Sequence, residues 1–367
     1  MSLRVGIDAT PLLGRRTGVG HYTARLLEHL VDRDLSLTAT AFTARGGAAL
    51  PGALPPGVAS RARPVPARLL RAAWSRCELP PVELLVGAVD VFHAPNFVLP
   101  PARRARGVVT VHDLAYLHAA DTVHRSSLAY RSLVPRSLAR AAVVCTVSGA
   151  VADEIAATYA VDRAAIVLAP PGVDEGWFDA APLPAAAREA AGLPGGDYLV
   201  AVGTLEPRKN LARLVRAHAD LWRSGVHVPL VLAGGAGWGP ALELEHSPPG
   251  SVVLPGYLAD DVLRGLVAGA AALAFPSLYE GFGMPPVEAL ACGVPVVAAD
   301  LPVSREVLGS AATLVDPYDV DALAGALAAA LEDRDAAAAA ARRAQARRWT
   351  WHSCAATMAA AYRRALT

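Results

Sequence analysis

Short apolar runs alternate with longer amphipathic stretches along the first half of the chain. The expected strands are residues 3–8, 37–44, 89–94, 108–113, 142–148 and 165–173. Helical patterns lie between them, among them one that follows the glycines of residues 16–22 and continues to Leu30, and another from Ala150 to Tyr159. Strands that alternate with helices predict a parallel, doubly wound sheet.

The same pattern starts again after a Pro/Ala/Gly-rich connector, residues 179–197. The expected strands are residues 198–204, 229–235, 252–257, 271–277 and 294–300, with helices at 211–223 and 260–269. We therefore predict an α/β protein of two Rossmann-like domains that face each other across a cleft, with the connector as a hinge.

The predicted domains are residues 1–174 on the acceptor side and residues 175–349 on the nucleotide side. Residues 342–364 hold six arginines and no acid, and we expect one terminal helix there that returns to the first domain with residues 350–367. A chain of 367 residues exceeds the size at which one hydrophobic core stops growing, which also favours two domains.

Composition restricts the classes of protein to consider. The four cysteines lack paired spacing, so we interpret them as reduced and intracellular, without a metal site. We see no signal peptide, and no uncharged apolar run of about 18 residues suggests a membrane-spanning helix. Residues 1–172 hold 19 arginines against 12 acids, a net charge of +7, so the first half is the better face for an anionic surface or acceptor.

The segment from Phe275 to Asp300 carries the strongest chemical signal. Glu280 precedes Gly281-Phe282-Gly283, where glycine permits close approach of the backbone to a ligand. Pro285 and Pro286 suit the first turn of a helix, and we expect Glu288 in that turn, where the helix dipole favours an anion. A carboxylate there can accept both hydroxyls of a ribose; the plain alternative is an acid that stabilises an ordinary helix.

A second polar segment follows the expected strand at residues 198–204. Arg208 and Lys209, the only lysine of the chain, lie in a strand-to-helix turn, and Asn210 suits the N-cap of the next helix. Two cations beside free N–H groups form a diphosphate site. The alternative is a basic surface loop.

Two weaker signals lie at strand ends in the first half. Gly18-Val19-Gly20 opens a helix after the first strand, where a phosphate or sugar could approach the backbone. His112 ends another strand and could hold a sugar hydroxyl or move a proton, with Asp113 orienting it. Residues 93–96, HAPN, could line an acceptor site or be structural.

Five arginines between residues 61 and 76 are interleaved with Leu69, Leu70 and Trp74. A basic stretch with an apolar side suits an anionic membrane surface, although a solvated loop and helix explains it equally. The chain shows neither aromatic stacking platforms nor zinc-ligand spacing, which argues against nucleic acid as a partner.

Taken together, these motifs resemble glycosyltransferase family 4, retaining enzymes of the GT-B fold. The similarity runs from TGVGHYT through VHDL, TVS and PPGVD to VGTLEPRKNL, AGGAGW, LPGYL and the EGFG segment. The form of these motifs in this chain is similar in particular to that of bacterial polysaccharide and O-antigen mannosyltransferases. The resemblance implies a nucleotide-diphosphate sugar as donor, GDP-mannose as the first hypothesis, and a glycan, lipid-linked or small-molecule hydroxyl as acceptor.

The resemblance also implies roles for individual residues. Arg208 and Lys209 would hold the diphosphate and Glu288 the ribose. The transferred sugar would be held by Glu280 and by the backbone at Phe282 and Gly283, with Met284 beside them. His112 would contact the sugar near its anomeric carbon, and Gly18, Val19 and Gly20 would let the N-terminal loop close over the phosphates. No metal or other cofactor is expected, and the protein would be cytoplasmic, with peripheral contact to the inner membrane face.

Other functions remain open at this point. A UDP- or dTDP-sugar could be the donor to a small molecule. A glycoside hydrolase could use Glu280 and Glu288 as its carboxyl pair, and a nucleotide-sugar-binding protein would need no turnover. Many relatives carry arginine directly after the strand glycine, where this chain has Thr204 after Gly203, so the separate roles of Arg208 and Lys209 are undecided.

Overall fold

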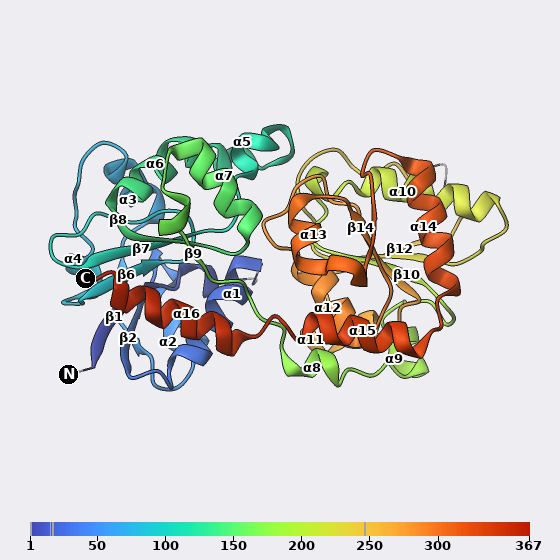
Figure 1. Ribbon diagram of the computed structural model, residues 1–367, viewed down its shortest axis with the longest axis horizontal. Helices are drawn as coiled ribbons and strands as arrows, with labels where there is room; N and C mark the ends of the chain where they lie inside the picture. The colour runs from blue at the N-terminus through green and yellow to red at the C-terminus, as the bar shows by residue number, and fades with distance from the viewer. Residues whose placement is uncertain (1, 15, 17, 246) are drawn as a thin grey trace. The chain divides into compact units, whose positions relative to one another are not determined.

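The computed structural model describes residues 2–14, 16, 18–245 and 247–367. They form two compact units, each described here by itself (Figure 1). Unit 1 comprises Met1–Leu117, Arg125–Gly172 and Thr350–Thr367, and unit 2 comprises His118–His124 and Val173–Trp349. The connector at residues 179–197 lies inside unit 2, so the prediction that it is the hinge is wrong.

Unit 1 is built on a seven-stranded parallel sheet of order β4-β2-β1-β6-β7-β8-β9. The strands are β1 (Leu3–Asp8), β2 (Leu35–Thr40), β4 (Ala59–Ser60), β6 (Val91–Ala94), β7 (Arg106–Val111), β8 (Ala141–Thr146) and β9 (Val167–Leu168). The strand expected at residues 37–44 is divided, because Phe42 N–H donates to the Thr10 hydroxyl (2.8 Å) and starts a separate two-stranded pair. That pair is β3 (Phe42–Thr43) and β5 (Arg63–Pro64).

Helices cover both faces of this sheet (Figure 1). They are α1 (Gly18–Leu30), α2 (Leu50–Ala53), α3 (Ala67–Trp74), α4 (Glu83–Val86), α5 (Ala115–His118), α6 (Tyr130–Arg140), α7 (Gly149–Tyr159) and α16 (Trp351–Arg364). The short 3₁₀ helices are η1 (Thr10–Leu12), η2 (Gly46–Ala49), η4 (Arg125–Ala129) and η5 (Arg163–Ala165). Side chains of α3, α6 and α7 share one apolar core with the strands, while α1 and α16 pack together.

Unit 2 repeats the plan with a six-stranded parallel sheet of order β12-β11-β10-β13-β14-β15. The strands are β10 (Leu199–Val202), β11 (Leu230–Ala233), β12 (Val252–Gly256), β13 (Ala272–Phe275), β14 (Val296–Ala299) and β15 (Thr313–Val315). Because all strands are parallel, their carboxyl ends meet at one edge, where open α/β sheets bind ligands. The two parallel sheets confirm the predicted α/β class.

The helices of unit 2 also cover both faces of its sheet. They are α8 (Glu175–Phe178), α9 (Ala185–Ala190), α10 (Leu211–Arg223), α11 (Asp260–Ala268), α12 (Met284–Cys292), α13 (Pro302–Leu308), α14 (Val320–Glu332) and α15 (Ala336–Ala346), with the 3₁₀ helices η3 (Ala120–Thr122), η6 (Pro207–Lys209) and η7 (Gly309–Ala311). Leucines spaced by three or four residues on α10 and α14 pack into one core with the strands. Within the described chain, no helix is both long and apolar enough to cross a bilayer.

The arginine-rich C-terminal segment forms two helices rather than the single one expected. The chain leaves α15 after Ala346, and Thr350 caps α16 by accepting a hydrogen bond from Ser353 N–H (3.1 Å). Helix α16 belongs to unit 1, where Tyr362 donates or accepts a hydrogen bond with Nδ1 of the fully buried His93 (2.9 Å). The other ring nitrogen of His93 meets the Thr110 hydroxyl (2.8 Å), so the polar groups of His93 are used within the core.

We predict that Tyr362→Phe lowers the free energy of unfolding by about 1–3 kcal/mol, because it leaves His93 Nδ1 buried without a partner. Chemical denaturation monitored by circular dichroism measures the change. Tyr318→Phe is the matched control, since the Tyr318 side chain is 63% exposed and its hydroxyl can bind water. Equal stability of the Tyr362→Phe variant and the parent would contradict the structural role of this bond.

Candidate active site

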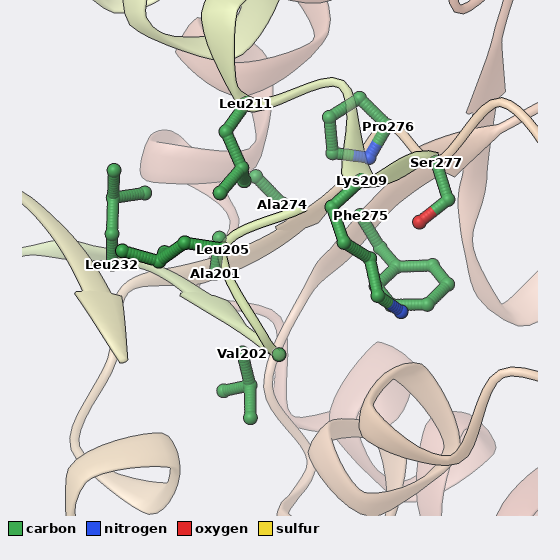
Figure 2. Close-up of a pocket in the computed structure, with 11 residues that line it drawn as sticks. Ala201, Val202, Leu205, Lys209, Leu211, Leu232, Ala274, Phe275, Pro276 and Ser277 are labelled. Carbon is green, nitrogen blue, oxygen red and sulfur yellow. The ribbon is translucent and has the colours of Figure 1, made fainter. Parts of the chain in front are cut away.

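The turn after β10 brings the chain's single lysine to the carboxyl edge of the unit 2 sheet. Gly203 follows β10 with φ +149°, and a Cβ there would lie 3.1 Å from Cε of Lys209. The missing side chain therefore leaves room for Lys209 to extend beside the Phe275 ring, as Figure 2 shows. Its Nζ lies 4.6 Å from the centre of that ring.

Four charged side chains form a network at this turn. Lys209 Nζ lies 2.7 Å from Glu280 Oε1, and Arg208 Nη1 lies 2.9 Å from Glu280 Oε2. Arg208 also donates from Nε and Nη2 to Glu206 Oε1 (3.0 and 2.6 Å) and from Nη1 to the Tyr279 carbonyl (2.8 Å). The structure thus brings together Arg208, Lys209 and Glu280, which the sequence motifs singled out separately.

Glu206 is the member of this network that the sequence analysis missed. Its side chain is only 5% exposed, and it forms an ion pair with Arg208 two residues later. The sequence did contain one signal for Glu206, namely that this carboxylate lies only two residues before Arg208, a predicted diphosphate-binding cation. The sequence alone does not assign a role to Glu206, because its contact with the Arg208 guanidinium forms only when the chain folds into the η6 turn.

The electrostatic balance of the network follows from burial and pairing. Burial alone would raise the pKa of Glu280, but the positive charges of Arg208 and Lys209 outweigh it and lower that pKa to about 2. Burial lowers the pKa of Lys209, against the opposing effect of Glu280. Two cations and two carboxylates give the network a formal charge of zero.

Asn210 holds the turn in place in a way that differs from the expectation. It has φ +56° and makes no side-chain cap on α10. Instead its Nδ2 donates to the carbonyls of Pro276 (3.0 Å) and Pro317 (2.7 Å), and its Oδ1 accepts from Arg213 (2.8 Å). Asn210 therefore occupies the predicted N-cap position of α10, but its side chain joins the turn to the loops after β13 and β15 instead of capping the helix.

The start of α12 has the backbone geometry that its glycines and prolines predict. Gly283 precedes the helix with φ +87°, and Pro285 and Pro286 lie in its first turn. The Phe282 ring packs edge-on against Trp349 with centroids 5.3 Å apart, so its side chain has a structural contact within unit 2. Met284 is the first helical residue and is partly exposed.

Glu288 does not lie where the sequence analysis expected it. Helix α12 begins at Met284, so Glu288 is its fifth residue and no acid lies in the first turn. Its charged neighbours are Asp174, Asp260 and Arg264. Burial and the two aspartates raise the pKa of Glu288 to about 8, the opposite of the stabilised anion that a first-turn position would give.

His112 lies at the carboxyl end of β7 in unit 1. Its Nε2 donates to the Pro95 carbonyl (2.7 Å), and its ring meets Tyr22 and Phe97 edge-on (4.9 and 5.9 Å). Burial lowers its pKa, so the ring is neutral near pH 7 with Nδ1 as its acceptor. Asp113 Oδ1 accepts from Ala115 N–H (3.0 Å), and its negative charge favours the protonated form of His112 against the effect of burial.

The remaining first-half candidates have mostly structural roles. Helix α1 begins at Gly18, so Gly18, Val19 and Gly20 open a helix as predicted; residues 15 and 17 lie outside the described residues. A Cβ at Gly20 would lie 2.6 Å from the Pro11 carbonyl, whereas one at Gly18 would meet open space. Gly20 is thus required for packing, while Gly18 leaves the helix start accessible. Burial lowers the pKa of His93 to about 3, and its core position favours the structural reading of residues 93–96.

The cavity drawn in Figure 2 lies between β10, β13 and Lys209 and measures about 10 Å³. This volume has room for about one water molecule. The cavity is therefore too small to hold a nucleotide or a sugar.

Comparison with known proteins gives consistent matches over both units. Residues 16–177 match the family described as Glycosyltransferase Family 4, and residues 186–347 match Glycosyl transferases group 1. O-antigen chain mannosyltransferase B of Escherichia coli is 32% identical over 275 residues, 72% of this chain and 71% of that protein. O-antigen chain mannosyltransferase RfbU of Salmonella typhimurium is 30% identical over 214 residues, 58% of this chain and 57% of that protein.

Solved structures match the whole fold. The Anabaena protein HepE, in a complex with UDP and glucose, superposes with a TM-score of 0.71 at 19% identity over 98% of each chain. At that identity the match establishes the fold alone, which is GT-B. The chain belongs to glycosyltransferase family 4 and is a glycosyltransferase, as the motif resemblance predicted.

We predict that Glu288→Gln stabilises the protein at pH 9 but not at pH 4. The pKa of Glu288 is about 8 when folded and 4.5 ordinarily, so its stabilising contribution is complete below pH 4.5 and is lost as the pH rises through 8. At 1.36 kcal/mol per pKa unit, the gain at pH 9 is up to about 5 kcal/mol.

Denaturant titrations of parent and variant at both pH values measure this difference in the free energy of unfolding. The pH dependence of all other titratable groups is common to both proteins and cancels in the difference. Asp197→Asn, which removes a carboxylate paired with exposed Arg334 (2.8 Å), is the control for charge removal alone. A variant that is equally stabilised at pH 4 and pH 9 would show that the carboxyl group is not held protonated.

Proposed function

We propose that this glycosyltransferase transfers a hexose, mannose from GDP-mannose, to a hydroxyl acceptor in the synthesis of a cell-envelope glycan or glycolipid. The observation that carries the proposal is the pairing of Arg208 and Lys209 with Glu280 at the carboxyl edge of the unit 2 sheet. The mannosyltransferases among its relatives support the choice of sugar.

In this proposal the donor binds over the charge network of unit 2. Arg208, Lys209 and the backbone amides near Gly283, ahead of the two prolines that lack N–H groups, bind the diphosphate, because a helix N-terminus and fixed cations favour anions. Glu280 accepts hydroxyl hydrogen bonds from the transferred sugar, and Glu288 binds the ribose. These fixed positive groups supply the charge that a divalent metal supplies in other transferases, so the reaction requires no metal.

The transfer proceeds with retention of the anomeric configuration. The bond from the anomeric carbon to the diphosphate oxygen breaks, and the acceptor oxygen bonds to that carbon on the same face. The acceptor proton passes to an oxygen of the leaving diphosphate. Preorganised cations stabilise the negative charge that develops there, while neutral His112 contacts the sugar near its anomeric carbon through Nδ1.

The surroundings of the two glutamates favour transfer over hydrolysis. A glycoside hydrolase needs two carboxyl groups that flank one glycosidic bond. Glu280 is held by Arg208 and Lys209, whereas the charged neighbours of Glu288 are Asp174, Asp260 and Arg264. A hydrolase would also leave the cations of the η6 turn without a function.

A surface of unit 1 supports a lipid-linked acceptor. We call it the arginine–leucine surface, and it comprises the exposed residues Arg68, Leu69, Arg76, Leu79, Leu84, Arg103 and Arg104. Hydrogen bonds hold its segments together, from Trp74 Nε1 to the Pro80 carbonyl (3.1 Å) and from Val82 N–H to the Pro101 carbonyl (2.8 Å). Leucines 69, 79 and 84 are 65%, 53% and 60% exposed.

The acids near this surface are engaged elsewhere. Glu83 Oε1 accepts three backbone N–H groups, those of residues 103–105, and Glu78 is paired with Arg140 (2.6 Å). Within the described part of the chain, none of the four arginines of this surface is in an ion pair. Unpaired guanidinium groups beside exposed leucines suit a bilayer with anionic headgroups.

We predict that Lys209→Ala lowers turnover of the donor by about 10²-fold, because one preorganised charge at the leaving group is lost. Arg216→Ala, which removes an exposed cation of α10, is the control and should retain turnover. Product formation from GDP-mannose, with the anomeric configuration read by NMR, measures both. Unchanged turnover of Lys209→Ala would exclude the diphosphate role.

The donor can be identified independently by thermal shift. We predict that GDP raises the melting temperature more than UDP, dTDP or ADP at equal concentration, because ligand binding stabilises by mass action. A larger shift with UDP, the nucleotide in the HepE complex, would support the UDP-sugar alternative. The absence of a shift with every nucleoside diphosphate would overturn the proposed donor class.

We predict that the double variant Arg68→Glu/Arg76→Glu no longer sediments with vesicles containing phosphatidylglycerol, while the parent protein does so at low salt. Each basic residue near an anionic bilayer contributes about 1 kcal/mol. The control, Arg223→Glu/Arg334→Glu, changes the net charge equally on exposed positions of unit 2. Equal sedimentation of the parent with pure phosphatidylcholine would contradict an electrostatic contact.

A further inference from the structure

The two cations assigned to the diphosphate are already bound to a carboxylate of the protein. Both oxygens of Glu280 are used, one by Lys209 Nζ (2.7 Å) and one by Arg208 Nη1 (2.9 Å), and the three side chains are only 10–18% exposed. With Glu206 included, the network is formally neutral. An incoming diphosphate therefore meets cations whose charge is already balanced.

We propose that Glu280 acts as an internal competitor for the diphosphate, so that the site binds a nucleotide-sugar in preference to the nucleoside diphosphate that the reaction leaves behind. This inference rests on the proposed function and specifies how the same site discriminates donor from product.

The contacts of Arg208 and Lys209 give these two cations different roles. Arg208 is held by three groups, Glu206, the Tyr279 carbonyl and Glu280, so it keeps two of them when Glu280 turns to a ligand. Glu280 is the only carboxylate in an ion pair with Lys209 among the residues that the structure describes. Arg208 is thus the fixed member of the pair, and Lys209 is the cation whose charge Glu280 controls.

The donor and the product differ in what they offer to Glu280. A carboxylate has about four acceptor positions, so Glu280 can accept hydroxyls of the transferred sugar when its bonds to the cations lengthen. Hydrogen bonds to a charged acceptor are roughly twice as strong as neutral ones. The free diphosphate carries no such hydroxyls, and it must compete with Glu280 for Lys209 without that compensation. Product release is favoured as a result.

The test compares the affinities of GDP and GDP-mannose for the full-length protein by isothermal titration calorimetry. In Glu280→Gln we expect GDP to bind about tenfold more tightly, a change of 1.4 kcal/mol, because Lys209 is freed for the phosphates. GDP-mannose should bind no more tightly than to the parent, since its hydroxyls lose a charged acceptor. The ratio of the two dissociation constants then moves toward the product.

Two further variants make the result specific. Glu206→Gln removes the same charge from the network but touches only Arg208, so we expect it to leave GDP affinity unchanged or to weaken it. Asp197→Asn removes an ion-paired carboxylate next to the amino end of β10, away from the turn, and should change neither affinity. Equal tightening of GDP binding in all three variants would show a general effect of net charge and overturn the proposal.

Folding of the Glu280 variant is checked by circular dichroism and thermal melting. If Glu280→Gln does not fold, Glu280→Asp replaces it, with a shorter side chain that weakens the Lys209 pair and should tighten GDP binding by a smaller factor. Unchanged or weaker GDP binding in the folded Glu280 variant overturns the competitor role while leaving the proposed function intact. Failure of the parent protein to bind any nucleoside diphosphate overturns the proposed function itself.

Discussion

The structure of unit 2 at its carboxyl edge depends on one interaction, the contact of Glu280 with Arg208 and Lys209. The η6 turn after β10 supplies the two cations, and the loop after β13 supplies the carboxylate. A buried ion pair stabilises only where its geometry is good and its remaining hydrogen bonds are satisfied. Glu206, the Tyr279 carbonyl and Asn210 meet that requirement, since they fix the guanidinium and join the turn to the loops after β13 and β15.

The same interaction fits the phosphate and sugar chemistry of the proposed function. The low pKa of Glu280 keeps the carboxylate ionised at any working pH, so it is able to accept hydroxyl hydrogen bonds. The cations remain charged because the carboxylate balances them in a place where burial opposes charge. A site whose charges are balanced before the ligand binds favours ligands that offer both an anion to its cations and hydrogen-bond donors to its carboxylate.

Unit 1 uses a different device at the corresponding edge of its sheet. The bond from His112 to the Pro95 carbonyl fixes the proton on Nε2, the rings of Tyr22 and Phe97 pack against the imidazole, and burial lowers its pKa. Helix α16, although last in the chain, completes the core of this unit through Tyr362 and His93. The first unit therefore requires the final helix for its buried polar groups to be satisfied.

Much of this protein is determined by local sequence. Apolar runs of strand length, their alternation with helices, and the glycines and prolines around residues 281–286 predict the α/β class, the parallel sheets and the start of α12, because these features follow from backbone preferences over a few residues. The sequence also singles out Arg208, Lys209 and Glu280 as candidates, since their motifs are contiguous, and the structure places the three side chains in one charge network. Tertiary structure decided what these residues contact. Glu206 holds Arg208, the Asn210 side chain joins loops instead of capping α10, and His112 donates to the Pro95 carbonyl, because each contact depends on how the segments pack. Glu288 is the clearest case: its helix was predicted, but its raised pKa comes from Asp174 and Asp260, neighbours that only the folded chain brings to it.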